Sequence, residues 1–316
     1  MEVVVVGPGA LGCLLAARLG RFNRVRLFDR DPARASFLEC QGVVLEEDDN
    51  VSVVPVGATA DPNAVGVADL VLLCVKSPKV TEAVNLSRPF LTRAGLILAL
   101  QNGISHLESL PGLLAGRCWG LGVTAQGATL VAPGRVRHRG RGLTRIGWPP
   151  DESGSGSEFK RGCHPDLLEV AGSLTEAGIE TRVADDILPH LWAKLLVNAG
   201  INALTAIHDC PNGDLLKSPE VLARLDAVVR EGEAVAKKKG IRLERDPVEM
   251  TIEICRATRA NFSSMLQDVR AHRLTEIDAI NGALVRQGHS LGVPVAGNEE
   301  LVRQVRDLER KYHDFT

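Results

Sequence analysis

Aromatic side chains are scarce in this sequence, in which 7 Phe, 3 Trp and 1 Tyr make up 3% of 316 residues. Proteins that bind single-stranded nucleic acid stack its bases on aromatic side chains, so this scarcity argues against such a function. A formal net charge of -2 at pH 7 also provides no overall attraction to nucleic acid or to an anionic membrane. We therefore expect neither nucleic acid nor a membrane as a partner.

Long apolar runs, a secretion signal and metal-binding spacings are also lacking. No run approaches the roughly 18 apolar residues of a membrane span, and no basic segment with a following apolar stretch opens the chain. The eight histidines are dispersed, so we expect no metal site. The cysteines form no C-x-x-C pair, which is typical of reduced thiols in a cytoplasmic protein. They are Cys13, Cys40, Cys74, Cys118, Cys163, Cys210 and Cys255.

The first half of the chain alternates short apolar runs with helical patterns. Residues 3–6 and 24–28 read as strands, and residues 11–19 read as the helix between them. Residues 70–75 and 96–100 are continuously apolar, which is typical of strands buried on both faces of a parallel sheet. Such alternation predicts a Rossmann-type doubly wound sheet with right-handed crossovers.

The pattern changes towards the second half. Between residues 116 and 147 the runs are short and glycine-rich, and we expect Val136 and Ile146 on edge strands. Residues 151–158 have linker composition and predict an exposed loop. Helical periodicity then begins near Ile187, with helices expected over 190–204, 219–239, 246–261, 264–273 and 275–288. We therefore predict an α/β protein with a Rossmann domain over 1–185 and an all-helical domain over 186–316.

A glycine-rich turn, Gly7-Pro-Gly9-Ala-Leu-Gly12, follows the first strand and opens the first helix. The first glycine permits a tight turn, the second lets the backbone approach a pyrophosphate, and the third allows close packing of helix on strand. Asp29 follows about 20 residues on, as the dinucleotide-binding fingerprint requires. The residues expected to bind the phosphates are Gly7, Gly9, Ala10, Leu11 and Gly12.

Polar residues follow two of the predicted parallel strands. Lys76 comes directly after 70–75, and Asn102 follows the run that starts at residue 96. Ligands of open α/β sheets lie beyond the carboxyl ends of the strands, so both are candidate ligand contacts. A solvated lysine and an ordinary Asn-Gly turn are the alternatives.

Three polar residues form a stripe on an otherwise apolar helix. Lys194, Asn198 and Asn202 are spaced i, i+4, i+8, and everything between them is apolar or glycine. A buried ammonium needs a partner or a depressed pKa, and a ligand carboxylate would supply such a partner. The alternative is a narrow solvated stripe on a surface helix.

A second polar cluster has simpler explanations. Ser264 and Gln267 fit a capping box, which alone would account for Ser264. Glu276 fits an acidic residue in the first turn of the helix predicted over 275–288, where it would be stabilised by the helix dipole.

Taken together, these motifs resemble the ketopantoate reductase (2-dehydropantoate 2-reductase) family. The resemblance covers nearly the whole chain and is most specific over 7–12, over 191–213, and over 261–268 with 275–278. It implies that NADPH reduces the 2-oxo group of 2-dehydropantoate to pantoate, on the pathway to pantothenate.

The resemblance also implies roles for single residues. Lys194 matches the catalytic lysine that protonates the carbonyl oxygen as hydride arrives. Lys76, Asn102 and Glu276 match positions that bind the cofactor. The residues that match substrate-binding positions are Asn102, Asn198, Asn202, Asn212, Asn261 and Ser264.

Two residues at the end of the second strand favour different cofactors. Asp29 would accept hydrogen bonds from an adenosine ribose and repel a 2′-phosphate, which favours NAD. Arg30 stands where the resembling family binds the phosphate, and a guanidinium can clamp a phosphate bidentately. Asp29 can also pair with a nearby arginine such as Arg34. We expect NADP, with NAD as the alternative and with weaker discrimination than an enzyme that lacks the aspartate.

Two other functions remain open. One is a sister enzyme, such as a D-2-hydroxyacid dehydrogenase, that acts on another 2-oxo acid and uses NAD. The other is a non-catalytic NAD(P)-sensing module, against which the proton donor Lys194 argues. The expected partner is a small 2-oxo acid, and the oligomeric state stays open, with a homodimer among the alternatives.

Overall fold

The structure is a computed structural model that describes residues 1–150 and 163–313, with only the backbone described at 92–94. The predicted linker over 151–158 lies outside the described residues. The chain divides into two compact units. Unit 1 comprises Met1–Gln101 and Ser109–Ile187, and unit 2 comprises Asn102–Glu108 and Leu188–Thr316. The short segment Asn102–Glu108 therefore belongs with the helices of unit 2, which no pattern in the sequence indicated.

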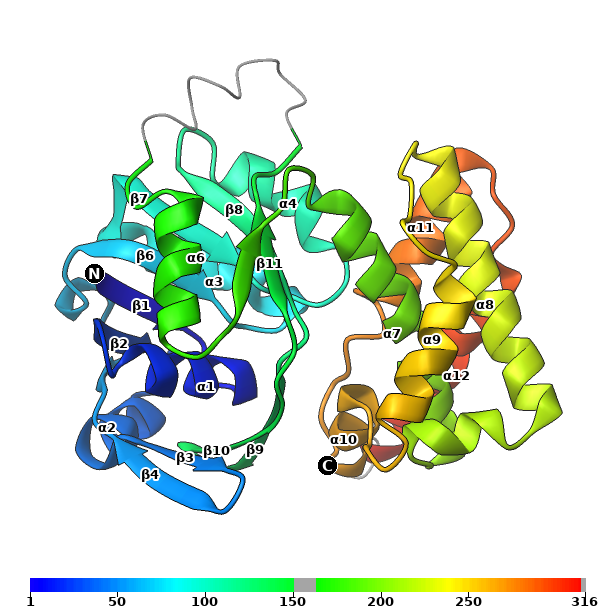
Figure 1. Cartoon of the computed structure of the whole chain (residues 1–316), viewed down its shortest axis with the longest axis horizontal. Coiled ribbons are helices and arrows are strands. Elements are labelled where there is room, and N and C mark those ends of the chain that lie inside the picture. The colour runs from blue at the N-terminus through cyan, green and yellow to red at the C-terminus, as the bar shows by residue number, and fades with distance from the viewer. Residues whose placement is uncertain (151–162, 314–316) are drawn as a thin grey trace. The chain divides into compact units, whose positions relative to one another are not determined.

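Within the described residues of unit 1, eight strands form a sheet in the order β12-β11-β8-β7-β6-β1-β2-β5 (Figure 1). All neighbours are parallel except β8 and β11. The Rossmann-type sheet is thus confirmed. The strands are β1 (Glu2–Val6), β2 (Arg24–Phe28), β5 (Gly57–Thr59), β6 (Ala68–Leu73), β7 (Leu91–Ala99), β8 (Trp119–Thr124), β11 (Thr144–Gly147) and β12 (Thr181–Val183).

The helices of unit 1 cover this sheet and a second, smaller one. α1 (Ala10–Leu19) packs against β1 and β2, and also against the strands of the small sheet. It can do so because it is apolar nearly all round, with seven of its ten residues buried. The other helices are α2 (Pro32–Gln41), α3 (Val80–Ser87), α6 (Leu167–Glu176) and α4 (His106–Leu113), whose first turn belongs to unit 2.

The small sheet corrects one expectation from the sequence. In the described part of the chain it has the order β4-β3-β10-β9, with β3 (Val43–Glu47), β4 (Asn50–Val54), β9 (Gly127–Ala132) and β10 (Arg135–Gly140). Val136 lies on β10, between β3 and β9, and Ile146 lies on β11, between β8 and β12. The prediction of edge strands was wrong for both, because one partner of each strand, β3 for β10 and β12 for β11, comes from a distant segment that local patterning does not reveal.

Unit 2 is helical, as predicted. α8, α9, α10 and α12 all pack against α7 (Figure 1), and the buried apolar residues of these helices form one core. The helices are α7 (Leu188–His208), α8 (Pro219–Lys238), α9 (Pro247–Ala257), α10 (Ser264–Arg270), α11 (Asn281–Leu291) and α12 (Ala296–His313). α11 begins six residues later than expected, and α12 was not anticipated. In the described ranges no helix is long and apolar enough to cross a membrane.

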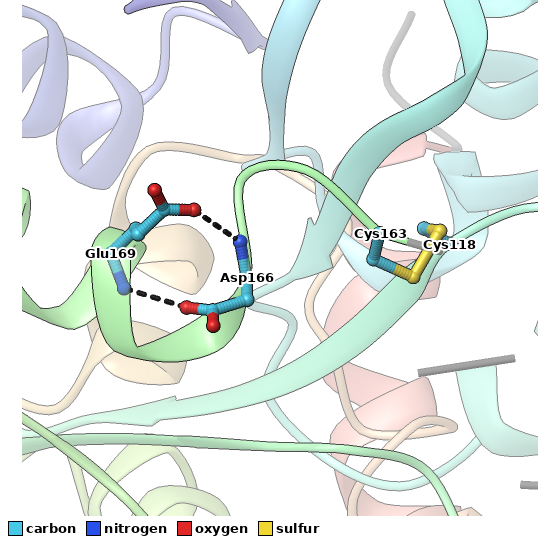
Figure 2. Close-up of a disulfide and its surroundings, with 4 residues drawn as sticks. All are labelled: Cys118, Cys163, Asp166 and Glu169. Atoms are coloured by element: carbon cyan, nitrogen blue, oxygen red, sulfur yellow. Dashed lines mark hydrogen bonds between the residues drawn. A yellow bond between two sulfur atoms is a disulfide. The ribbon is translucent and has the colours of Figure 1, made fainter. Parts of the chain in front are cut away.

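A disulfide joins Cys118, just before β8, to Cys163 (Figure 2). The expectation that all cysteines are reduced was therefore wrong for this pair, since 45 residues separate cysteines that the fold brings together. Both side chains are buried. Three residues after Cys163, Asp166 caps α6 in a capping box with Glu169, which fixes the backbone that follows the disulfide.

The disulfide predicts a defined thiol count and a stability effect. In denaturant without reductant, five cysteines should react with a thiol reagent, and seven should react after reduction. Cys163→Ser should lower the free energy of unfolding by about 2–4 kcal/mol, because the cross-link restricts the unfolded chain. Chemical denaturation of both proteins measures the effect. Seven reactive thiols without reductant would contradict the disulfide.

Candidate active site

The glycine-rich turn between β1 and α1 has the geometry that each glycine predicts. Gly7 has φ +97°, a conformation that favours glycine. A Cβ on Gly12 would lie 2.1 Å from the carbonyl oxygen of Gly7, so only glycine permits this close packing. A Cβ on Gly9 would meet no protein atom within 4 Å. The turn is therefore tight where it packs on the protein and open at Gly9.

The open side of the turn coincides with the start of α1. Gly9 is the N-cap residue, and no side chain caps the helix. The first backbone N–H groups of the helix are therefore not used by a capping side chain, and they carry the partial positive charge of the helix dipole. Ala10 and Leu11 begin α1 directly after Gly9. We call these three residues the rim of the turn. The arrangement fits the pyrophosphate of a dinucleotide.

Two ion pairs lie at the carboxyl end of β2. Asp29 is buried, with 4% of its surface exposed, and both of its carboxylate oxygens accept hydrogen bonds from Arg34. Arg30 is exposed and donates to Glu82 of α3, with Nη1 and Oε1 2.7 Å apart. Both groups that were expected to select the cofactor thus have partners of opposite charge.

Lys76 and Asn102, the two polar residues expected after parallel strands, lie in different units. Lys76 is exposed and precedes a short 3-10 helix, Ser77–Lys79, in unit 1. β6 ends at Leu73, two residues earlier than expected, so Lys76 does not directly follow the strand. Asn102 belongs to unit 2.

The polar stripe lies on α7, the central helix of unit 2. Asn202 is buried with 6% of its surface exposed, while Lys194 and Asn198 are partly exposed. Burial of the ammonium lowers the pKa of Lys194 to about 8, and the nearby carboxylate of Glu276 opposes this shift. The stripe is thus partly buried and contains a lysine with a perturbed pKa, so it is not a fully solvated face.

Glu276 is held in place by Asn102. The amide Nδ2 of Asn102 donates to Oε2 of Glu276 over 3.1 Å. The turn after Asn102 can approach because Gly103 has φ +78°, and a Cβ there would lie 2.1 Å from the carbonyl oxygen of Ala279. Glu276 lies in a turn before α11, so its interpretation as an acid in the first turn of a helix was wrong. The structure therefore brings Lys194, Glu276 and Asn102 together within unit 2.

Asn212 and Asn261 also lie close together. The backbone N–H of Asn212 donates to the carbonyl of Asn261 over 2.9 Å, and Nδ2 of Asn212 donates to Thr258 over 2.9 Å. Oδ1 of Asn212 is buried and accepts no hydrogen bond from any residue that the structure describes. A buried acceptor of this kind is costly unless a water or a ligand donates to it, so Asn212 is a candidate ligand contact.

Ser264 proves free of the capping role proposed for it. Ser263 is the N-cap of α10, and its hydroxyl accepts from the N–H of Leu266 over 3.1 Å. Thr205 of α7 donates to the same hydroxyl over 2.7 Å. Ser264 and Asn261 are exposed. The capping-box interpretation was therefore displaced by one residue, and the buried contact from Thr205, which the sequence analysis missed, ties this loop to α7.

Comparison with known proteins identifies the family. Two family models match the chain: "Ketopantoate reductase PanE/ApbA" over residues 3–151 and "Ketopantoate reductase PanE/ApbA C terminal" over 186–309. The chain is 34% identical to a 2-dehydropantoate 2-reductase of Pyrococcus horikoshii, with 90% of each chain covered. It is 33% identical to that of Halobacterium salinarum, with 98% of each covered. The chain belongs to the ketopantoate reductase family and is an NAD(P)-dependent oxidoreductase.

Solved structures agree with this assignment. A PanE/ApbA family ketopantoate reductase from Ralstonia eutropha matches with a TM-score of 0.88 and 33% identity, over 99% of this chain and 100% of that one. A D-mandelate dehydrogenase with NADH and anilino(oxo)acetate matches with the same TM-score and 25% identity, also over 99% and 100%. The fold is therefore shared by enzymes named for different 2-oxo or 2-hydroxy acids.

The open space beside Gly9 leads to a prediction. Gly9→Ala should weaken binding of NADPH and NADH about tenfold or more, because a methyl group would crowd the pyrophosphate at a cost of about 1–3 kcal/mol. The free energy of unfolding should change little, because the added Cβ meets no protein atom. Gly112→Ala, at a second glycine with open space, is the matched control for binding by isothermal titration calorimetry. Unchanged affinity in Gly9→Ala would contradict the assignment.

Proposed function

We propose that this enzyme reduces 2-dehydropantoate to pantoate with NADPH, and that Lys194 donates the proton. The observation that carries the proposal is the lysine itself, a partly buried ammonium with a pKa lowered to about 8, in line with two amides on α7. The resemblance of the sequence to the family assigns the catalytic lysine to this position.

The proton has a defined route in this scheme. NADPH supplies, when bound, the hydride that reduces the 2-oxo carbon. As the carbonyl double bond opens, negative charge develops on its oxygen, and the Lys194 ammonium stabilises that charge and transfers a proton to it. Lys194 is left as the neutral amine and regains a proton from water. A pKa near 8 suits both steps, since most of the lysine is charged at neutral pH and yet it releases its proton readily.

Glu276 and Asn102 position and tune the donor. The carboxylate of Glu276 raises the pKa of Lys194 against the effect of burial, so it favours the charged ammonium. The hydrogen bond from Asn102 holds the carboxylate in place. The family resemblance also assigns Asn102 to the cofactor and the substrate.

The amides and hydroxyl of unit 2 would hold the substrate. Asn198 and Asn202 follow Lys194 along α7. A 2-oxo acid whose carbonyl oxygen receives the proton of Lys194 would therefore lie beside them. Asn212 offers a buried Oδ1 that is suited to accept from a substrate hydroxyl. Ser264 is the first residue of α10, Asn261 lies three residues before it, and both are exposed; the family resemblance assigns them to the substrate.

The cofactor would be held by residues of unit 1. The rim formed by Gly9, Ala10 and Leu11 would take the pyrophosphate, and Lys76 and Arg30 would supply positive charge. Discrimination against NADH is expected to be modest, because Arg30 already pairs with Glu82.

A second candidate function is a D-2-hydroxyacid dehydrogenase that uses NAD. The observation in its favour is the 0.88 TM-score to D-mandelate dehydrogenase, a protein solved with NADH. The residues proposed to hold the 2-oxo carboxylate and to donate the proton would serve both reactions. Only the groups around the far end of the substrate would differ.

A substrate panel separates the two functions. The purified enzyme should oxidise NADPH with 2-dehydropantoate at a kcat/KM well above that with benzoylformate, pyruvate or branched 2-oxo acids. The measurement is NADPH and NADH absorbance at 340 nm across the panel. A preference for benzoylformate with NADH would select the dehydrogenase instead, and no turnover with any 2-oxo acid would contradict both proposals.

Replacement of the proton donor should abolish most of the rate. Lys194→Ala is expected to lower kcat by at least about 10²–10⁴-fold, the range for loss of general acid catalysis. The Kd of NADPH should change much less, because the groups proposed to hold the pyrophosphate and the 2′-phosphate lie in unit 1. Steady-state kinetics and nucleotide titration provide the two measurements, and near wild-type turnover would contradict the role of Lys194.

Glu276→Gln is the matched variant for the pH dependence. In the wild type, kcat/KM should fall as the pH rises through about 8, because the ammonium is then lost. Removing the carboxylate charge removes what holds the pKa up, so the alkaline limb should move to lower pH. A limb that stays in place or moves to higher pH would show that Glu276 does not tune the donor.

A further inference from the structure

The carboxyl end of β2 carries two pairs of opposite charge, of which the proposed cofactor role uses only the pair of Arg30 with Glu82. Asp29 is paired with Arg34, and Arg30 is paired with Glu82. An acid at the position of Asp29 would repel a 2′-phosphate, and an arginine at the position of Arg30 would attract one. Each group that bears on the choice of cofactor is thus matched by a counter-charge on another element.

The Asp29–Arg34 pair is built into the fold. Nε of Arg34 donates to Oδ2 of Asp29, and Nη2 donates to Oδ1 over 2.8 Å. The N–H of Asp31 adds a third hydrogen bond to Oδ1 over 3.2 Å. A bidentate guanidinium–carboxylate pair uses the acceptor sites of the acid and neutralises its charge.

The backbone around both partners is also fixed. Asp31 caps α2 and accepts from the N–H of Arg34 over 3.2 Å, with Pro32 at the first position of the helix. The N–H of Asp29 donates to the carbonyl of Thr59 on β5 over 3.1 Å. Arg34 therefore approaches Asp29 from the first turn of a capped helix, and its side chain is still 41% exposed.

The second pair acts on Arg30. Its partner Glu82, in the first turn of α3, also lies 3.5 Å from the Lys79 ammonium. The hydrogen bond from Arg30 lowers the pKa of Glu82, so this carboxylate is charged at neutral pH. A phosphate that binds Arg30 would have to compete with it.

From these contacts we infer that Arg34 is the residue that admits a 2′-phosphate, by neutralising Asp29, and that Glu82 limits the preference for it by holding Arg30. The inference rests on the proposed use of NADPH. Without Arg34, Asp29 would be a buried carboxylate with no cationic partner at the ribose, where it would repel a phosphate and accept from ribose hydroxyls. Arg34 is a positioning residue for cofactor choice, and it acts through Asp29.

The test compares nucleotide binding in variants of the full-length enzyme. Dissociation constants for NADPH and NADH, and for 2′,5′-ADP and 5′-AMP, are measured by isothermal titration calorimetry. Arg34→Ala should lower the affinity for NADPH relative to NADH by about tenfold, as one unmasked charge a few ångströms from a phosphate predicts. Arg34→Lys should retain most of the preference, and Glu82→Gln should strengthen NADPH binding because Arg30 is released.

Two further variants make the test specific. Asp29→Asn/Arg34→Ala should recover the wild-type preference, since the repelling charge is gone, and it also removes the buried charge that could unfold Arg34→Ala. Arg24→Ala removes an arginine at the opposite end of β2, where it pairs with Glu2, and should change nothing.

The outcomes separate the inference from the proposed function. An unchanged NADPH-to-NADH ratio in Arg34→Ala would overturn the inference and leave the proposed reaction standing. A double variant as weak for NADPH as Arg34→Ala would overturn it too, because Arg34 would then bind the phosphate directly. A wild-type enzyme that binds NADH and not NADPH would instead contradict the proposed cofactor.

Discussion

The candidate site in unit 2 is arranged around one ammonium group on an apolar helix. Burial destabilises the charged form of Lys194, and its pKa falls to about 8. The shift stops there because Glu276 faces it, and Glu276 is held by Asn102. Asn102 in turn depends on Gly103, the residue that lets this turn meet the carbonyl of Ala279. The poorly solvated ammonium of Lys194 thus has a carboxylate nearby, and that carboxylate has its own hydrogen-bond donor.

Unit 1 also contains a buried charge, and here a fully paired ion pair satisfies it. The buried carboxylate of Asp29 would be costly alone, and the arginine from α2 satisfies both of its oxygens. In the glycine-rich turn the constraint is steric: Gly7 and Gly12 close the turn on itself, while Gly9 leaves room beside the helix terminus. In each unit these polar groups are therefore preorganised, which lowers the entropic cost of ordering them when a ligand binds.

Much of this could be predicted from local patterns. The bounds of β2, the glycine-rich turn and the polar stripe on α7 follow from short-range periodicity and spacing. What local patterns did not reveal depends on partners far away in the sequence: the interior place of Val136, the Cys118–Cys163 disulfide and the place of Asn102 in unit 2. The cap of α10 failed differently. Ser264 has the Gln267 that a capping box needs, but Ser263 is the N-cap, and its hydroxyl also accepts a buried hydrogen bond from Thr205 on α7.

The fold lowers the pKa of Lys194, and Glu276 limits the shift. The most direct test is a titration of the lysine side chains by NMR, with ¹³C-labelled lysine and the Lys194 resonance assigned from its absence in Lys194→Arg. We expect a pKa near 8 for Lys194 in the folded enzyme. A value near the ordinary one of about 10.4 would contradict it.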